Sequence, residues 1–185
     1  MTDDIKDIFD NFEKYFSEKR KPLEENSRFQ IFDKMSPKGI VYRKGIKVGQ
    51  HDGLIYDYNF YEIDINESRV ITSGFELESR LRVAWKSGAS VNMLERLLKE
   101  KESLELNTDW QFDSWIRFSD NWLHALKDRI IVPKEYSGNY VEDLADTKSV
   151  MLPDRLCNEL HKQFKDKLTI RNHIVTGKQI GRAHV

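Results

Sequence analysis

The chain has 185 residues, which is enough for one ordinary domain with a buried core of its own. Ten Phe, seven Tyr and four Trp, within an apolar content of 39%, exclude the composition of a disordered chain. A net charge of −1 gives no global field toward nucleic acid or an anionic membrane, and the single cysteine, Cys157, excludes an internal disulfide.

The sequence also lacks targeting signals. No apolar run is long enough to cross a bilayer, and no signal-peptide core follows the charged start. With one cysteine, which suits a reducing compartment, this predicts a cytoplasmic protein with neither a membrane nor nucleic acid as partner. Residues 180–185 match one reading frame of a common sequencing adapter. We therefore expect them to be an artefact, and expect residues 171–185 to be a tail without fold information.

Residues 1–27 are expected to form an amphipathic helix and a linker. Apolar side chains recur at spacings of three and four, which predicts one helical stripe. The stripe consists of Ile5, Ile8, Phe9, Phe12, Tyr15 and Phe16. The basic run 19–21 and Pro22 end the helix. Because such a stripe is unfavourable in water, it must pack on the rest of the chain or on a partner.

Residues 28–86 are expected to form the next unit, and from Arg28 to Val48 the period changes to two, which predicts strands. Ile40–Tyr42, a turn at 43–45 and the alternation from Ile46 to Val48 predict a β-hairpin. The aromatic segment 54–65 predicts one or two further strands. The sequence Ser73-Gly-Phe-Glu76 is a capping box, so a helix should begin there and end at 86–88.

Residues 87–170 are expected to form a mainly helical extension. One helix is predicted near 91–103, and a second begins at the capping box 108–111 and runs to Leu126. A buried strand at 130–132 and a loop at 136–150 should follow. Pro153 then suits the first turn of a last helix through Phe164. The pattern as a whole predicts an α+β fold.

The chain contains no self-contained catalytic motif. It has neither a phosphate-binding glycine loop nor a Cys-x-x-Cys pair, and its histidines lack helical metal-site spacing, so no metal site is predicted. Asp109 and Asp113 fall one turn apart on a predicted helix and could serve acid/base chemistry. The helix dipole offers a simpler reason for acids at that N-terminus. Cys157 has no obvious neighbouring base and is interpreted as a buried structural thiol.

One ordered set of motifs stands out. The hairpin sequence Gly39–Val48 is followed by the tyrosine-rich segment 54–60, then by Ile63-Asp-Ile-Asn-Glu-Ser-Arg69, then by the capped helix that ends in Ala84-Trp85. This order resembles the middle segment of Hsp90-like ATPases of the GHKL class, and looks closest to phage and bacterial proteins of the rapid-lysis-protein type. The resemblance covers residues 27–86. It implies a small ribosomal-S5-like sheet with a hairpin and a crossover helix, followed by the helical extension.

The resemblance implies a role for two residues. In the chaperones of this class, a middle-domain loop of the form Leu-Asn-x-Ser-Arg-Glu carries an arginine that reaches the γ-phosphate. By that resemblance, Arg69 is the catalytic and nucleotide-contacting arginine and Asn66 organises its loop. The chain departs from the chaperone pattern at Val70, which replaces a glutamate, and at Ser73, which replaces a glutamine.

The resemblance also implies partners and cofactors. ATP and Mg²⁺ would bind a nucleotide-binding domain that precedes this segment and is missing from it. ATPase activity would then belong to the full-length protein, while the fragment alone would be inactive. An unidentified protein partner is expected, and a homodimer remains open.

Three other interpretations remain open. In the first, Asn66 and Ser68 cap a strand-to-helix turn while Arg69 pairs with Glu67 or Glu76. In the second, the chain is a non-catalytic interaction module, for example a phage accessory protein that binds a host factor. In the third, scattered carboxylates make a stand-alone hydrolase.

Overall fold

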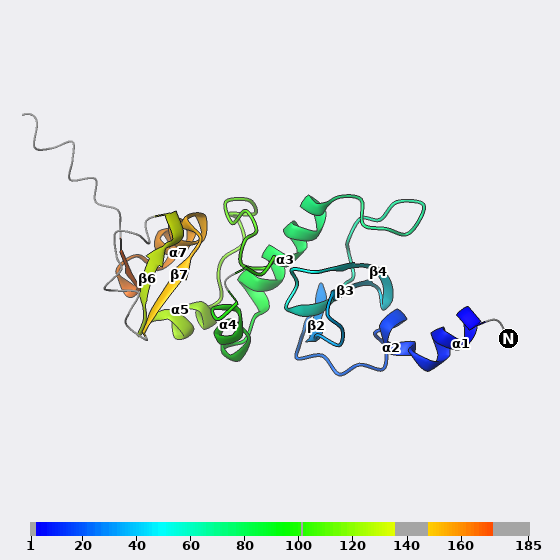
Figure 1. The fold of residues 1–185 in the computed structure, drawn as a ribbon. Coiled ribbons are helices and arrows are strands. Elements are labelled where there is room, and N and C mark those ends of the chain that lie inside the picture. Colours follow the sequence, from blue (N-terminus) through cyan, green and yellow to red (C-terminus); the bar gives the residue numbers. More distant parts are fainter. Residues whose placement is uncertain (1–2, 101, 136–147, 172–185) are drawn as a thin grey trace, which may run out of the picture.

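The computed structural model describes residues 3–100, 102–135 and 148–171 and has two sheets around one core (Figure 1). The first sheet has the order β1-β2-β5-β3-β4, with β3 and β5 parallel and the other pairs antiparallel. Its strands are β1 (Glu24–Glu25), β2 (Phe29–Asp33), β3 (Gly39–Arg43), β4 (Ile46–His51) and β5 (Tyr56–Phe60). The second sheet is parallel with the order β7-β6-β8. Its strands are β6 (Ile130–Pro133), β7 (Ser149–Leu152) and β8 (Thr169–Ile170). These sheets and the helices confirm the α+β class.

Helices connect and cover the two sheets. They are α1 (Asp3–Asp10), α2 (Phe12–Tyr15), α3 (Gly74–Gly88), α4 (Val91–Leu97), α5 (Asp120–Leu126), α7 (Asp154–Phe164) and the short 3₁₀ helix η2 (Lys165–Lys167). Figure 1 shows α3 between the two sheets. All five strands of the first sheet precede α3, and the next strand, β6, belongs to the second sheet. Helix α3 therefore covers the first sheet and leads out of it, rather than crossing over to another of its strands.

The predicted hairpin is confirmed. Strands β3 and β4 pair across a two-residue turn in which Lys44 (φ 49°) and Gly45 (φ 85°) are both left-handed, as a type I′ turn requires. The neighbouring strand β5 also holds the turn, because the Gly45 N–H donates to Asn59 Oδ1 at 2.8 Å. A buried amide of β5 therefore fixes the tip of the hairpin.

The predicted helix after Ser73 is also confirmed. Ser73 Oγ accepts from the Glu76 N–H at 3.2 Å, as a cap should. The Glu76 carboxylate accepts from the Asp64 N–H instead, so it ties the preceding loop to α3. The buried face of α3 includes Leu77, Leu81 and Trp85, which lie against the first sheet.

The predicted helix from 108 to 126 is wrong over its first two thirds. Residues 108–119 form turns, and α5 begins only at Asp120. Trp110, Phe118 and Trp122 pack against one another with ring centroids 5.3–5.9 Å apart. This packing brings rings from several sides into one cluster, and tertiary contacts of this kind override helix propensity.

Boundaries differ in other places as well. Helix α4 ends at Leu97, earlier than the predicted 103. Strand β7 begins at Ser149, within the segment interpreted as a loop. The buried strand at 130–132 is confirmed and is the centre of the second sheet, and α7 begins after Pro153 as predicted. The predictions for residues 136–147 and 172–185, including the tail, lie outside the described residues.

The N-terminal segment is anchored by one buried ion pair. Arg20, part of the basic run that was expected only to end a helix, places Nη1 2.8 Å from the carboxylate of fully buried Asp57 in β5. Its guanidinium also stacks on Phe32 and Tyr42, with its central carbon 4.7 and 5.8 Å from the ring centroids. Residues near Arg20 are thereby fixed to the first sheet.

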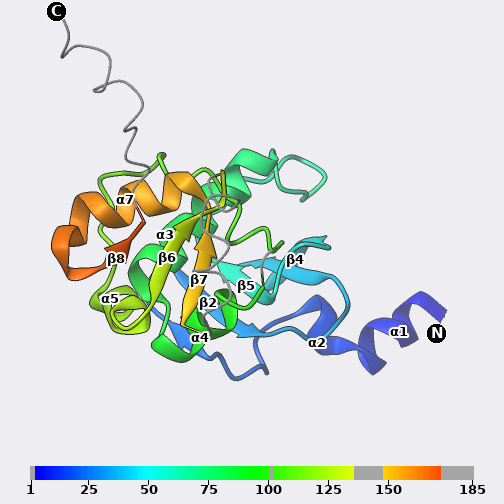
Figure 2. The ribbon, with the colours of Figure 1, turned by 60° about the vertical axis from the view of Figure 1, so that its left-hand side comes forward.

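The predicted single helix is interrupted at Asn11, and its stripe is only partly covered. Phe12 and Phe16 are half-buried, whereas Ile5, Ile8 and Phe9 are exposed, Phe9 by 69%. Figures 1 and 2 show α1 extending away from the sheets. The described residues therefore leave half of the apolar stripe without cover. Among those residues, no helix combines the length and apolar character needed to span a membrane.

Arg20→Met is expected to lower the free energy of unfolding by about 3–5 kcal/mol, because Asp57 is left as an unpaired buried carboxylate. Urea denaturation measures the change. Adding Asp57→Asn should restore part of the loss, since a neutral amide oxygen can still accept the Ile40 N–H. Lys21→Met, at an exposed neighbour, is the control and should stay within about 0.5 kcal/mol. An Arg20 effect as small as that of Lys21 would contradict the anchoring role.

A second buried acid ties the first sheet to the segment after α4. Glu105 is fully buried, and its Oε1 accepts from the Ile55 N–H at 2.8 Å and the Tyr58 hydroxyl at 2.9 Å. Its Oε2 is buried without a hydrogen-bond partner among the described residues. Burial raises the pKa of the Glu105 carboxyl, only partly offset by these hydrogen bonds.

This raised pKa predicts a pH-dependent cost. Below the ordinary pKa of 4.5, Glu105 is neutral in both states and its burial costs no ionisation free energy. As the pH rises through the raised pKa of the folded state, the carboxyl ionises inside the core and the protein loses stability. Glu105→Gln cannot ionise, so its stability relative to wild type should improve with pH, by at most about 1.4 kcal/mol per pH unit. Urea denaturation of both proteins between about pH 4 and pH 8 tests this. A constant difference across that range would show that Glu105 does not carry the effect.

Candidate functional site

The loop that carries Arg69 is a tight turn closed by Asn66. The Asn66 N–H donates to the Val70 carbonyl at 2.8 Å, and Asn66 Oδ1 accepts from the Val70 N–H at 3.0 Å. The Arg69 N–H donates to the Asn66 carbonyl at 2.9 Å. Ile65 and Ile71 pair as a bridge on either side. The backbone from 65 to 71 is thus held in one shape, with the Asn66 side chain as part of the closure.

Arg69 occupies a left-handed position in this loop, with φ at 60°. That conformation is uncommon for a residue with a side chain, and Gly or Asn adopts it at lower cost. The side chain is exposed and forms no hydrogen bond or ion pair within the described part of the chain. Glu76, one of the acids considered as its partner, pairs with Arg80 at 2.8 Å. The Arg69 side chain is therefore exposed to solvent on a loop whose backbone is fixed by hydrogen bonds.

The loop is seated on the hairpin sheet. A Cβ at Gly49 of β4 would come within 3.2 Å of Ile71 Cδ1, so the isoleucine packs directly on the glycine backbone. Figures 1 and 2 both show the loop before α3 projecting toward the end of the molecule that carries α1, away from the second sheet. The structure thus places Asn66 and Arg69 together on one loop that projects away from the second sheet.

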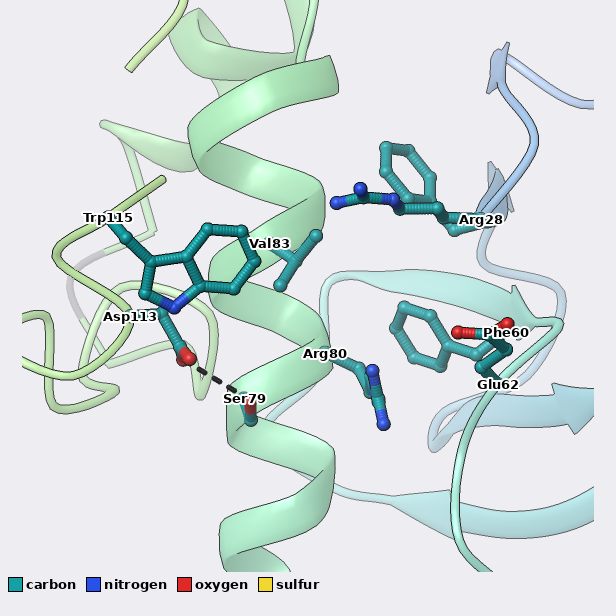
Figure 3. Close-up of a pocket in the computed structure, with 9 residues that line it drawn as sticks. Arg28, Phe60, Glu62, Ser79, Arg80, Val83, Asp113 and Trp115 are labelled. Atoms are coloured by element: carbon teal, nitrogen blue, oxygen red, sulfur yellow. Dashed lines mark hydrogen bonds between the residues drawn. The ribbon is translucent and has the colours of Figure 1, made fainter. Parts of the chain in front are cut away.

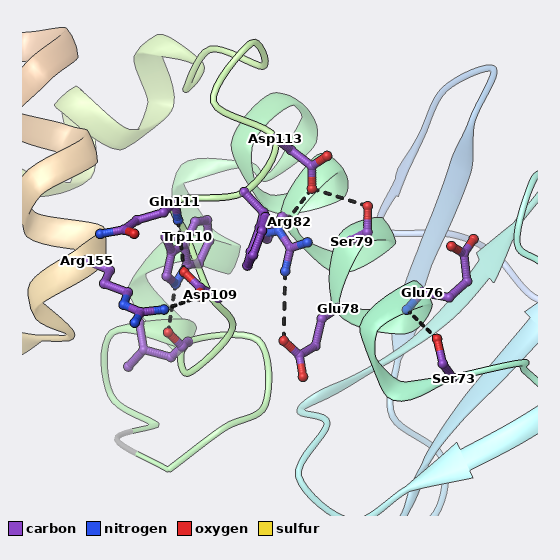
Figure 4. A network of polar contacts seen from close by, with 12 residues as sticks. Ser73, Glu76, Glu78, Ser79, Arg82, Asp109, Trp110, Gln111, Asp113 and Arg155 are labelled. Carbon is purple, nitrogen blue, oxygen red and sulfur yellow. Dashed lines mark hydrogen bonds and ion pairs between the residues drawn. The ribbon is translucent and has the colours of Figure 1, made fainter.

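A second polar cluster lies on α3, where the sequence predicted none. Arg82 is fully buried, and its Nε donates to Asp113 Oδ2 at 3.0 Å (Figure 4). Asp113 Oδ2 also accepts from Ser79 Oγ at 3.2 Å, and Arg82 Nη1 lies 3.8 Å from Glu78. The guanidinium further faces the rings of Phe75 and Phe112, which meet edge to face. Arg82 thus fastens the 108–119 segment to α3.

Lys86, one turn further along α3, holds the same segment. It is fully buried, and its Nζ lies 3.1–3.4 Å from the carbonyl oxygens of Trp110, Phe112 and Asp113. Burial lowers the pKa of the Lys86 ammonium, with the acids Glu159 and Asp113 acting against that shift. Carbonyls that a helix would have used internally are instead bound by this ammonium, which explains why residues 110–113 are not helical.

The candidate acid/base pair Asp109 and Asp113 receives no support from its geometry. Asp109 and Asp113 are not on a helix, contrary to the prediction, and each has its own cation. Asp109 pairs with Arg155 of α7 and Asp113 with Arg82. Both carboxylates are therefore engaged in holding the 108–119 segment to neighbouring helices.

The remaining candidate chemistry is that of the single thiol and of metal-binding side chains. Cys157 is buried as predicted, and burial raises the pKa of its thiol to about 12, so it is inert as a nucleophile near neutral pH. Within residues 3–100, 102–135 and 148–171, no group of three or more His, Cys, Asp or Glu side chains is arranged to hold a metal ion. In comparisons with known proteins, the chain matches no family model, no curated protein and no solved structure.

Sequence reasoning missed Arg82 and Lys86. Charged residues at an i, i+4 spacing on a helix are usually interpreted as a solvated face. A signal was nevertheless present, because each cation directly follows a residue of the buried stripe, Leu81 and Trp85. Charged side chains at the edge of a helix's apolar stripe lie close enough to the core to be covered by another segment of the chain.

Asp113→Ala is expected to cost about 3–5 kcal/mol of unfolding free energy, since it leaves the Arg82 guanidinium buried without its closest acid. Asp109→Ala is the matched control on the same segment. It removes a partly exposed pair with Arg155 and should cost about 1 kcal/mol or less. Urea denaturation compares the two. Equal losses would mean that burial of Arg82 does not distinguish these pairs.

Proposed function

We propose that this chain is the middle, or transducer, segment of an Hsp90-like ATPase, in which Arg69 contacts the γ-phosphate of ATP held by an N-terminal nucleotide-binding domain. One observation carries the proposal: the Arg69 guanidinium is exposed and free of partners in the described structure, on a loop whose backbone is closed on both sides. Phosphoryl transfer develops charge on the phosphate oxygens, and an arginine supplied by another element stabilises it.

The chemistry of the side chain suits this role. A guanidinium stays charged at any physiological pH and can donate to two phosphate oxygens at once. A left-handed backbone at an arginine costs free energy that glycine or asparagine would avoid. The backbone conformation alone would therefore favour glycine or asparagine at position 69. A contact between the guanidinium and phosphate gives a reason for arginine instead.

The N-terminal segment supports a domain docked nearby. Ile5, Ile8 and Phe9 are exposed on α1, which lies toward the same end of the molecule as the Arg69 loop (Figure 2). Apolar side chains that recur on one helix face commonly mark an interface. In this proposal they cover the junction with the nucleotide-binding domain. ATP and Mg²⁺ belong to that domain, the isolated segment is inactive, and the full-length protein acts in the cytoplasm.

The test is Arg69→Ala in the full-length protein. ATP turnover should fall by about two orders of magnitude or more, because arginines that contact the transferred phosphoryl group contribute roughly 10³–10⁵-fold. ATP affinity should change little, since most of the nucleotide is bound elsewhere. Turnover and nucleotide binding are measured separately, by phosphate release and by titration of a non-hydrolysable analogue.

Two further variants separate the guanidinium from the loop. Arg69→Asn suits the left-handed backbone and should be at least as stable as wild type, yet as slow as Arg69→Ala. Arg117→Ala, at an exposed arginine on the 108–119 segment, should leave turnover unchanged. Unchanged turnover in both Arg69 variants removes this residue from the mechanism.

A second candidate function is a non-catalytic interaction module. It is favoured by exposed aromatic side chains, namely Phe75 and Phe112, which meet edge to face, and Trp115. Large exposed aromatic side chains are typical of protein interfaces. Under this alternative, Arg69→Ala has no effect on any turnover and a protein partner binds without nucleotide.

A further inference from the structure

A pocket of about 280 Å³ lies beside α3 (Figure 3), and because its lining includes no residue of the Arg69 loop it is independent of the proposed function. One of its walls is the 108–119 segment, which contributes Trp115. The other wall comes from the ends of β2 and β5, with Arg28 and Glu62. Buried Phe29 and Phe60, together with Val83, supply apolar surface. The volume is just below the range of about 300–1,000 Å³ that suits drug-sized ligands, so it fits a smaller molecule.

The first wall presents an indole to solvent on a rigid support. Trp115 is 72% exposed, although the chain buries its three other tryptophans completely. The segment before it is held by Lys86 and by the Arg82–Asp113 pair, and Asp113 itself is left-handed, with φ at 56°. Buried charges and a strained backbone are costly, and they maintain the position of a ring that contributes little to the core.

The opposite wall carries two unpaired charges of opposite sign. Figure 3 shows the Arg28 guanidinium directed toward α3, with Glu62 on the same side of the pocket. Neither side chain forms a hydrogen bond or ion pair in the described part of the chain. The Arg28 backbone is fixed, since its N–H donates to Asn26 Oδ1 and its carbonyl accepts from the Tyr61 N–H.

The other two charges of the lining are already neutralised. Arg80 pairs with Glu76 at 2.8 Å and Asp113 pairs with Arg82 at 3.0 Å. A ligand therefore meets one free cation, one free anion, an exposed indole and apolar surface. A phosphate-like anion would satisfy Arg28 but would be repelled by the free Glu62 carboxylate. A small ligand with both charges satisfies both residues.

We propose that this pocket binds a free α-amino acid with an aromatic or branched apolar side chain. Its carboxylate pairs with Arg28, its ammonium pairs with Glu62, and its side chain packs against Trp115 and Val83. Charge-assisted hydrogen bonds at both ends fix the orientation, and contact with the indole adds apolar burial. The pocket would make the segment responsive to an amino acid.

The experiment titrates the purified chain with L-phenylalanine by calorimetry and by acrylamide quenching of tryptophan fluorescence. Because only Trp115 is exposed among the tryptophans, quenching reports mainly on this wall. We expect saturable binding with a Kd on the order of 1 mM or tighter, as a dozen heavy atoms allow, and protection of Trp115 from the quencher. Absence of saturable binding overturns the proposal.

Two variants and two analogues test the assigned contacts. Arg28→Gln and Glu62→Gln should each weaken L-phenylalanine binding by about tenfold or more. L-phenylalaninamide lacks the carboxylate, so its affinity should respond to Glu62→Gln and not to Arg28→Gln. N-acetyl-L-phenylalanine lacks the ammonium and should show the reverse pattern.

Arg117→Gln is the matched control, since Arg117 is exposed on the Trp115 segment and does not line this pocket. It should leave affinity unchanged. Arg28 and Glu62 are exposed, and urea denaturation should show that both variants remain folded. Affinity that is insensitive to both variants, or equal for N-acetyl-L-phenylalaninamide, would show simple aromatic adsorption and overturn the proposal.

Discussion

Trp85 joins the two parts of the molecule, and the rest of the architecture is arranged around this residue. Its indole N–H donates to the Tyr58 hydroxyl of the first sheet at 3.0 Å, and its carbonyl accepts from the Trp122 indole of α5 at 2.8 Å. The ring is fully buried and packs against Tyr56. Tyr58 in turn donates to buried Glu105. One residue of α3 thus connects a chain of buried polar groups from β5 to α5, and its links form only when the first sheet, α3 and α5 are packed together.

Two neighbouring residues of α3, Arg82 and Lys86, hold the 108–119 segment in place. Arg82 and Lys86 replace water around the turns of the 108–119 segment with fixed cations, and ordinary apolar residues there could not bind three carbonyls and a carboxylate. Such buried charges rarely add net stability compared with a well-packed apolar core. What they add here is a single conformation for a segment whose sequence would otherwise favour a helix. This explains why Phe112 and Trp115 face solvent despite their helical spacing.

The parts of the fold that could be predicted are those with local causes. The hairpin follows from strand alternation and Gly45, and α3 follows from the Ser73 cap and its apolar stripe, so both were found from sequence. The failures have non-local causes. Residues 108–119 lose their helix because Lys86, more than twenty positions away, binds their carbonyls. The parallel second sheet pairs β6 with β7 and β8 across long separations, which no local pattern encodes. The Arg69 loop was correctly placed before α3, but its closure by the Asn66 side chain and its packing on Gly49 of β4 depend on contacts that no sequence pattern encodes.

Asp113 and Arg69 make an instructive contrast. Both are charged residues in a left-handed backbone position where asparagine or glycine would be less costly. For Asp113 the reason lies inside the molecule, because its carboxylate accepts from Arg82 and Ser79 and so helps to fasten the turn to α3. Arg69 has no such inward role in the described structure: its loop is closed by Asn66, Val70 and the Ile65–Ile71 bridge, none of which uses the guanidinium. The left-handed backbone position therefore stabilises the fold in the case of Asp113. In the case of Arg69 it presents a cation to the surroundings, and the proposed phosphate contact rests on that exposure.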